Sequence, residues 1–247
     1  MTARSTAPNP PETAAGQSLG AMPCVLIGLQ EVVCGDCNVV GPQAGANVLV
    51  FDPPWEIEWE IPRGDWRHKI VFSDPQRLKD VLHMFGVPTT QFVWDCVSSW
   101  WVPGRPLKRA KLALWYGPLA DWNPDRAILD KPQPARLVKN TRGGYKAEAK
   151  PGTQLSEVYT LPITQRRADP HEKPMEWVRA MIGGCCGAAP VVYDPYGGSG
   201  SVAVACAELG IPSRSVEIDP AKMNAVCDRL RDRTKPPFMG ELFSANS

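Results

Sequence analysis

The sequence has no long apolar run and no clear excess of charge of either sign. It contains only three histidines among its 247 residues. No apolar stretch approaches the roughly 20 residues that a membrane-spanning helix requires, which excludes a protein anchored by such helices. Residues 1–20 are rich in Ala, Pro, Ser and Thr and lack the apolar core of a signal peptide. We therefore expect a disordered N-terminal tail and a cytoplasmic protein.

Support for metal or disulfide chemistry is also weak. Eight cysteines are scattered along the chain. Cys34 and Cys37 have the spacing of one half of a zinc site, but no second pair with this spacing follows. We expect reduced thiols and no bound metal.

Basic side chains are concentrated in one segment, although Lys plus Arg total 27 against 26 for Asp plus Glu. Between residues 102 and 150 there are eleven basic and four acidic residues. Such a segment can line nucleic-acid phosphates, and the tryptophans before it can stack on bases; a solvated surface loop is the alternative. The predicted DNA-contacting residues are Trp100, Arg105, Lys108, Arg109, Arg136, Lys139 and Arg142.

The last third of the chain alternates between helix-like and strand-like patterns. The predicted elements are a helix over 174–182 that ends at Gly183 and Gly184, a strand over 191–193, a helix over 202–209, a strand over 215–218 and a helix from Pro220. This alternation is typical of an α/β fold with a doubly wound, mostly parallel sheet.

The first half is less regular. The predicted elements are a short strand over 48–51, a loop over 56–70, a helix over 73–85 capped by Ser73, and strands over 91–94 and 111–115. Residues 98–105 resemble a turn, and residues 121–162 suit a small insert better than a core element. We expect one catalytic domain over 21–234, with an insert at about 117–165 and tails over 1–20 and 235–247.

A glycine-rich motif, DPYGGSGS, occupies residues 194–201 between a predicted strand and a predicted helix. Glycines let the backbone turn tightly and approach a ligand, while the first helical turn presents free N–H groups. Glu217 lies about 20 residues further on, where an acid binds ribose hydroxyls in such folds. Since no phosphate-binding GK[ST] follows, an adenosine-type ligand is favoured over a nucleoside triphosphate, with ligand-free packing as the alternative.

The second motif is FDPPW, at residues 51–55. The amino group of a base is a poor nucleophile because its lone pair is delocalised into the ring. The Asp52 carboxylate and a carbonyl held by Pro53-Pro54 could accept both N–H bonds and direct that lone pair at a methyl donor. Trp55 would stack on a base swung out of its helix. The alternative is a strand that ends in a proline turn beside a buried Trp.

Together the motifs resemble the amino methyltransferases of DNA, in the permuted arrangement called the beta class. There a DPP[YW] half comes first, the target-recognition segment second and the cofactor half third, which is the order found here. Gly35-Asp36 resembles a GD pair that often precedes the catalytic strand. The similarity covers roughly residues 34–230 and is weak between 117 and 165.

A further match precedes the last third of the chain. The family commonly has HPxxKP before the helix that leads to the glycine loop. Pro170, Lys173 and Pro174 match this pattern, whereas Asp169 stands in place of the histidine.

The resemblance implies a Rossmann-like, S-adenosylmethionine-dependent methyltransferase fold, with both motif-bearing strand ends on one edge of the sheet. The implied catalytic residues are Asp52, Pro53, Pro54 and Trp55. The implied cofactor-binding residues are Asp36, Lys173, Asp194, Pro195, Gly197, Gly198, Ser199, Gly200, Ser201, Glu217 and Asp219. Direct transfer to nitrogen requires no enzyme nucleophile, so none of the cysteines has to be catalytic.

Adenine N6 in DNA is the favoured target, because N4-cytosine enzymes often carry Ser where this chain has Asp52. N4-cytosine methylation, RNA adenine methylation and an inactive binding protein of the same fold are the alternatives. The size of the chain suggests a solitary modification enzyme. DNA is the expected partner, and a homodimer is a further hypothesis. A sliding clamp could bind residues 240–243, which end in Leu-Phe, although docking of this tail on the chain's own core is favoured.

Overall fold

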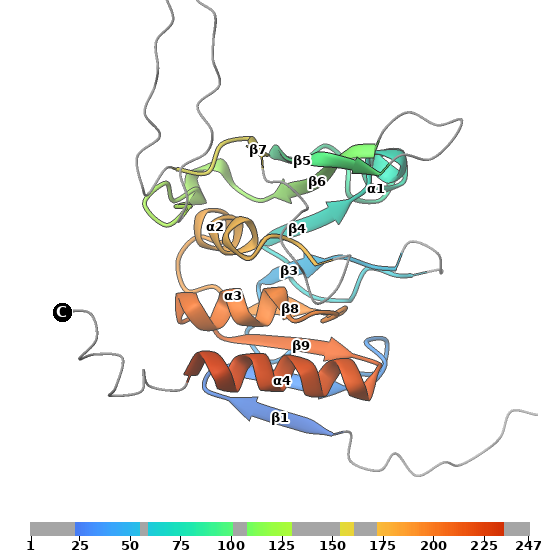
Figure 1. Cartoon of the computed structure of the whole chain (residues 1–247), viewed down its shortest axis with the longest axis vertical. Coiled ribbons are helices and arrows are strands. Elements are labelled where there is room, and N and C mark those ends of the chain that lie inside the picture. Colours follow the sequence, from blue (N-terminus) through green and yellow to red (C-terminus); the bar gives the residue numbers. More distant parts are fainter. Residues whose placement is uncertain (1–22, 55–58, 101–107, 130–153, 161–171, 235–247) are drawn as a thin grey trace, which may run out of the picture.

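A nine-stranded sheet runs through the protein, with the strand order β1-β2-β9-β8-β3-β4-β6-β5-β7 (Figure 1). The computed structural model describes residues 23–54, 59–100, 108–129, 154–160 and 172–234. The strands are β1 Cys24–Ile27, β2 Gln30–Cys34, β3 Val48–Phe51, β4 His68–Ser73, β5 Thr90–Trp100, β6 Lys108–Tyr116, β7 Val158–Thr160, β8 Val192–Asp194 and β9 Ser213–Glu217.

Four α-helices and two short 3-10 helices accompany the sheet within these ranges. The α-helices are α1 Leu78–Phe85, α2 Met175–Cys185, α3 Ser201–Leu209 and α4 Pro220–Thr234, and the 3-10 helices are η1 Pro75–Arg77 and η2 Leu119–Asp121. In this part of the chain no helix has the length and apolar character needed to cross a membrane.

The centre of the sheet is parallel. Neighbouring strands from β2 through β9, β8 and β3 to β4 all run in the same direction. β1 and β6 flank this block in the antiparallel direction, and the hairpin of β5 and β6 extends the sheet towards β7. The prediction of a mostly parallel α/β sheet is confirmed.

Helices cover both faces because the central strands are buried on both sides. All four residues of β3 are buried, as expected for a strand inside a parallel sheet. Val48 and Val50 belong to the core beneath α2 and α3, whereas Leu49 and Phe51 pack with Val81 of α1 on the opposite face. α2, α3 and α4 lie side by side over the first face (Figure 1). The sheet is therefore doubly wound, as predicted.

The chain leaves β3 and β8 in opposite directions. These strands are parallel neighbours, with Val48 paired to Val192 and Leu49 to Tyr193. From β8 the chain passes through α3 to β9 on one side, whereas from β3 it proceeds to β4 on the other. Such a reversal opens a crevice at the carboxyl ends of the two strands, where ligands bind in open α/β sheets.

Four strands were absent from the prediction. β1, β2 and β7 lie at or near the ends of the sheet, and β4 falls partly within the range predicted as a loop. The assignment of Ser73 as a helix cap is wrong, because Ser73 is the last residue of β4. Asp74 instead caps η1 by accepting the N–H of Gln76 at 3.2 Å.

The hairpin and the predicted insert also differ from expectation. β5 continues to Trp100, so residues 98–100 are strand rather than turn. Both ends of the segment predicted as an insert belong to the core, where Leu129, Leu155 and Tyr159 are buried together. No local pattern in the sequence predicts the burial of these residues, because polar and proline-rich stretches separate them.

Helix α2 passes through Gly183 and Gly184, where the sequence predicted its end. Packing explains these glycines: a Cβ on Gly183 would lie 2.4 Å from the carbonyl oxygen of Arg126. A Cβ on Gly184 would lie 2.6 Å from the Cβ of Ala127. The glycines therefore allow the 126–127 backbone to touch the helix.

Replacing Gly183 by Ala tests this close approach. Ala is about 1 kcal/mol better than Gly in a helix interior, so propensity alone predicts stabilisation. We expect instead that the clash with Arg126 lowers the free energy of unfolding by about 1–3 kcal/mol, measured by urea denaturation. An increase in stability would contradict the packing explanation.

Candidate active site

Three carboxylates gather at the carboxyl edge of the parallel strands. Asp52 directly follows β3, Asp194 ends β8 and Glu217 ends β9. Besides burial, which has the largest effect, the negative charges of Asp52 and Glu217 both raise the pKa of Asp194. The expectation that both motif-bearing strands end at one edge of the sheet is confirmed.

One carboxylate oxygen of Asp194 has no hydrogen-bond partner among the described residues. The residue is only 1% exposed, and its Oδ1 accepts the N–H of Tyr196 at 3.1 Å. Its Oδ2 is buried and accepts no hydrogen bond from the residues that the structure describes. Burial is the main cause that raises the pKa of Asp194 to about 7, with a further rise from the nearby Asp52 carboxylate. A buried acceptor of this kind suits a cationic or hydrogen-bond-donating group of a ligand.

Asp52 forms an ion pair with Lys173. The ammonium of Lys173 contacts Oδ2 of Asp52 and also lies 4.4 Å from the ring centroid of Phe72. The side chain of Lys173 is 15% exposed and that of Asp52 is 39% exposed. The carboxylate is thus held on one side and open to solvent on the other.

Glu217 ties the glycine loop to the end of β9. Its Oε2 accepts the N–H of Gly198 at 2.8 Å and its Oε1 accepts the N–H of Asp219 at 2.9 Å. Gly197 donates its own N–H to the carbonyl of Val216 at 2.7 Å. Ile218, the next residue after Glu217, is 72% exposed. An anionic acceptor and an apolar surface therefore lie side by side at this edge.

Other residues of the loop, which the sequence predicted to bind the cofactor, make packing contacts within the protein. Gly200 has a φ of +77°, and a Cβ there would lie 2.7 Å from Cγ1 of Val226 in α4. The hydroxyls of Ser199 and Ser201 lie 3.0 Å apart, and Pro195 is buried. Gly200 is thus required for the contact between the loop and α4.

Asp36 and Asp219 both cap backbone groups near Glu217. Oδ1 of Asp219 accepts the N–H of Ala221 at 2.8 Å at the start of α4. Oδ1 of Asp36 accepts the N–H of Asn38 at 2.9 Å, and the preceding Gly35 donates to the carbonyl of Glu217. These interactions place the loop that follows β2 beside the end of β9.

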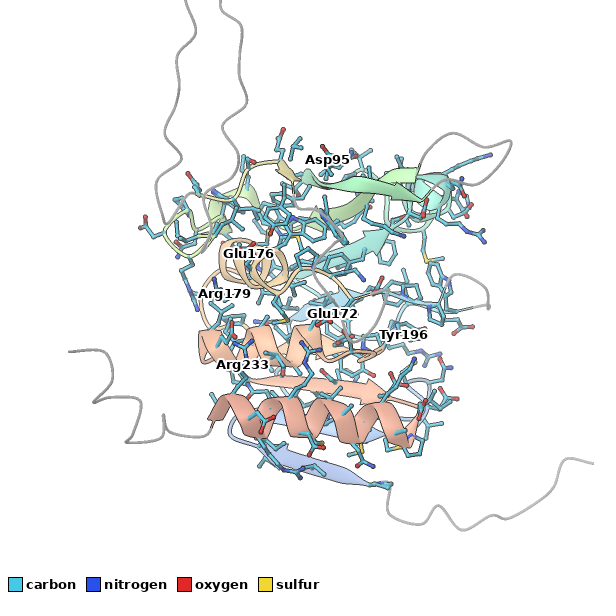
Figure 2. All side chains as sticks on the ribbon, in the orientation of Figure 1. Asp95, Glu172, Glu176, Arg179, Tyr196 and Arg233 are labelled. Carbon is cyan, nitrogen blue, oxygen red and sulfur yellow. The ribbon has the colours of Figure 1, made fainter. Side chains whose placement is uncertain are left out.

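Sequence reasoning missed three residues here: Tyr196, Ile218 and Arg229. The ring of Tyr196 meets Phe51 edge to face at a centroid distance of 5.5 Å. Arg229 of α4 binds the Glu172 carboxylate at 2.7 Å and also donates to the carbonyl of Ser199. In Figure 2, Glu172 is labelled in front of the sheet and Tyr196 is labelled at the edge of the sheet. Arg229 has no local motif, because its partners are 57 and 30 residues away.

Several predicted site residues lie outside the described residues. They are Trp55, Arg105, Arg136, Lys139 and Arg142. Trp100, Lys108 and Arg109 lie at the facing ends of β5 and β6, where only their strand positions are described.

Comparison with known proteins reveals shared architecture without close sequence similarity. No family model matches the chain, and no curated protein matches its sequence. Among solved structures, the PvuII DNA methyltransferase, which is cytosine-N4-specific, aligns with a TM-score of 0.53 and 12% identity over 84% of this chain and 88% of its own. The chain shares the mixed α/β fold of this enzyme.

Two further structures agree. M1.HpyAVI in complex with SAM aligns with a TM-score of 0.52 and 14% identity over 81% of this chain and 98% of its own. TTHA0409 of Thermus thermophilus, a candidate DNA modification methylase, aligns with a TM-score of 0.51 and 17% identity, covering 85% and 96% of the two chains. At these identities the comparison establishes the fold.

The buried Asp194 predicts a pH-dependent stability. Folding raises the pKa of Asp194 from 3.8 to about 7, so the folded protein favours the protonated carboxyl. The contribution of this group to the free energy of unfolding is therefore fully present below pH 3.8 and is lost as the pH rises through 7. Asp194→Asn removes this charge, so we expect it to stabilise the ligand-free protein at pH 8 by about 1–3 kcal/mol and much less at pH 5.

Thermal unfolding at both pH values measures the effect. Asp228→Asn is a matched control, because its side chain is 73% exposed on α4. We expect the control to change stability little at either pH. Equal effects of Asp194→Asn at pH 5 and pH 8 would contradict the assignment of a buried, destabilising charge.

Proposed function

We propose that this protein is an S-adenosylmethionine-dependent DNA methyltransferase that transfers a methyl group directly to an exocyclic amino nitrogen, adenine N6 in particular. The observation that supports this most strongly is the placement of Asp52 and Asp194 at the adjoining carboxyl ends of β3 and β8. The two motifs lie 142 residues apart in sequence, and the parallel pairing of β3 with β8 brings them together.

The residues around Asp194 fit S-adenosylmethionine. The unpartnered Oδ2 of Asp194 suits the cationic amino group of the methionine part. Glu217 suits the ribose hydroxyls, since each carboxylate oxygen can accept a second hydrogen bond beyond its backbone N–H. The exposed side chain of Ile218 suits the face of a purine. The loop therefore offers one group for each part of the cofactor.

Asp52 and Pro53 supply the groups that activate the base. The cofactor supplies an electrophilic methyl group on a sulfonium. The Asp52 carboxylate and the main-chain carbonyl of Pro53 accept the two N–H bonds of the amino group, which localises its lone pair for attack. Asp52 is also the nearest base for the proton that the nitrogen loses after transfer. Stacking of Trp55 on the flipped base remains a prediction.

The target base is proposed from the first residue of the motif. Asp52 favours adenine through the family resemblance, whereas N4-cytosine enzymes often carry Ser there. Because the PvuII enzyme is cytosine-N4-specific and shares this fold, the fold itself does not select the base. N4-cytosine is the second candidate for that reason.

The DNA-binding side of the proposal depends on the basic segment. Lys108 and Arg109 begin β6 opposite Trp100, and residues 101–107 between these strands lie outside the described residues. Phosphate contacts from this region would make DNA binding strongly salt-dependent. Membership of the permuted beta class and a homodimer also remain predictions. So does clamp binding through residues 240–243, which lie outside the described residues.

Glu217→Gln tests the cofactor assignment. The substitution keeps one acceptor and the shape of the side chain but removes the negative charge that strengthens hydrogen bonds to ribose hydroxyls. We expect S-adenosylmethionine to bind about tenfold more weakly, which corresponds to about 1.4 kcal/mol. Isothermal titration calorimetry measures this. Unchanged affinity in both Glu217→Gln and Asp194→Asn would remove the proposed cofactor site.

Asp52→Ala tests the chemical step. Because Asp52 is proposed to contact the base and not S-adenosylmethionine, the variant should bind the cofactor like the parent. Its rate of methyl transfer should fall about 100- to 1,000-fold, the usual loss when one preorganised contact to a reacting centre is removed. Single-turnover transfer of a tritiated methyl group to DNA measures the rate.

Nucleoside analysis of the methylated DNA identifies the product. N6-methyladenine is expected, and N4-methylcytosine would favour the second candidate. An Asp52→Ala variant that methylates as fast as the parent would refute the mechanism for either product.

A further inference from the structure

Lys173 connects the two halves of the proposed site. It lies two residues before α2, and its ammonium contacts Asp52 at the end of β3. The family resemblance assigns Lys173 to the cofactor pocket, but its ammonium contacts Asp52 and lies over the ring of Phe72. The structure thus places this cation on the catalytic carboxylate.

The ammonium of Lys173 has little freedom. The ring of Phe72, which is buried in β4, lies 4.4 Å away and attracts a cation through its π face. The Asp52 carboxylate provides the opposite charge. A pair in which the lysine is 15% exposed is screened less by solvent than a surface pair. The contact therefore fixes the orientation of the carboxylate.

The residue before Lys173 is anchored separately. The Glu172 carboxylate binds Nη2 of Arg229 at 2.7 Å, and Nη1 of the same arginine donates to the carbonyl of Ser199 in the glycine loop. Residues 172 and 173 therefore contact the cofactor half and the catalytic half, respectively. The position of the Lys173 ammonium depends on this anchoring to α4.

We propose that Lys173 is a positioning residue for Asp52. By holding Oδ2, it leaves Oδ1 directed at the amino group of the base, and its positive charge offsets the repulsion between Asp52 and the neighbouring Asp194. This inference rests on the proposed methyltransferase function and assigns Lys173 a role in the chemical step in place of cofactor binding.

Lys173→Met should separate the two roles. It keeps an unbranched side chain over Phe72 but removes the charge. We expect the single-turnover rate to fall about 10- to 100-fold because the carboxylate is misplaced. S-adenosylmethionine affinity, measured by calorimetry, should change far less than the rate. Lys173→Arg should restore most of the rate. Lys69→Met, at the amino end of β4 and thus the opposite edge of the sheet, is the matched control and should behave like the parent.

A double-mutant cycle identifies the partner. In an Asp52→Asn background, Lys173→Met should cause little further loss of rate, because the group that it positions is already gone. The same two changes should have non-additive effects on the midpoint of thermal unfolding, which is a readout that requires no activity.

The outcomes distinguish this inference from the proposed function. If the parent protein transfers no methyl group to DNA, the proposed function fails, while the unfolding cycle still tests the pair. If the parent is active and Lys173→Met retains full rate, or loses cofactor affinity in proportion to rate, the positioning role is overturned. Additive effects on unfolding would overturn it as well.

Discussion

The parallel pairing of β3 with β8 is the constraint on which the rest of the site depends. Because the two strands run in the same direction and the chain leaves them on opposite sides, their carboxyl ends border one crevice. The pairing is secured by burial, since all residues of both strands are inaccessible to solvent. Asp52 and Asp194, which are 142 residues apart in the sequence, therefore lie at the same edge of the sheet.

Electrostatic balance at this edge follows from the pairing. Three carboxylates converge there, and burial alone makes the ionised form of Asp194 costly. Lys173 reduces the repulsion, because its ammonium contacts Asp52 and lowers the pKa of Asp194. Without a ligand, the buried Oδ2 of Asp194 and the exposed side chain of Ile218 both lower the free energy of unfolding. Such cost is typical of a surface shaped for a ligand.

Close packing behind the edge holds the loops in place. The glycine at position 200 allows the loop to touch Val226, and Arg229 from the next turn of α4 binds the Ser199 carbonyl and Glu172. Helix α4 thus supports both the glycine loop and the segment that precedes α2. Gly183 has a comparable role at the other end of α2, where it allows Arg126 to approach.

The sequence alone determined the elements whose signals are local. The apolar run that stops at Asp52, the glycine motif and the regular helices of the last third predicted the fold class, since each depends on neighbouring residues. The shared edge of the two motifs was implied by their resemblance to the methyltransferase family. Tertiary structure decided the rest: β4 in a range predicted as a loop, the passage of α2 through two glycines, and the burial of Leu129 and Tyr159. It also decided the partner of Lys173, which lies 121 residues from Asp52. A contact across that separation leaves no pattern in a single sequence, because it exists only once the sheet has brought the two segments together.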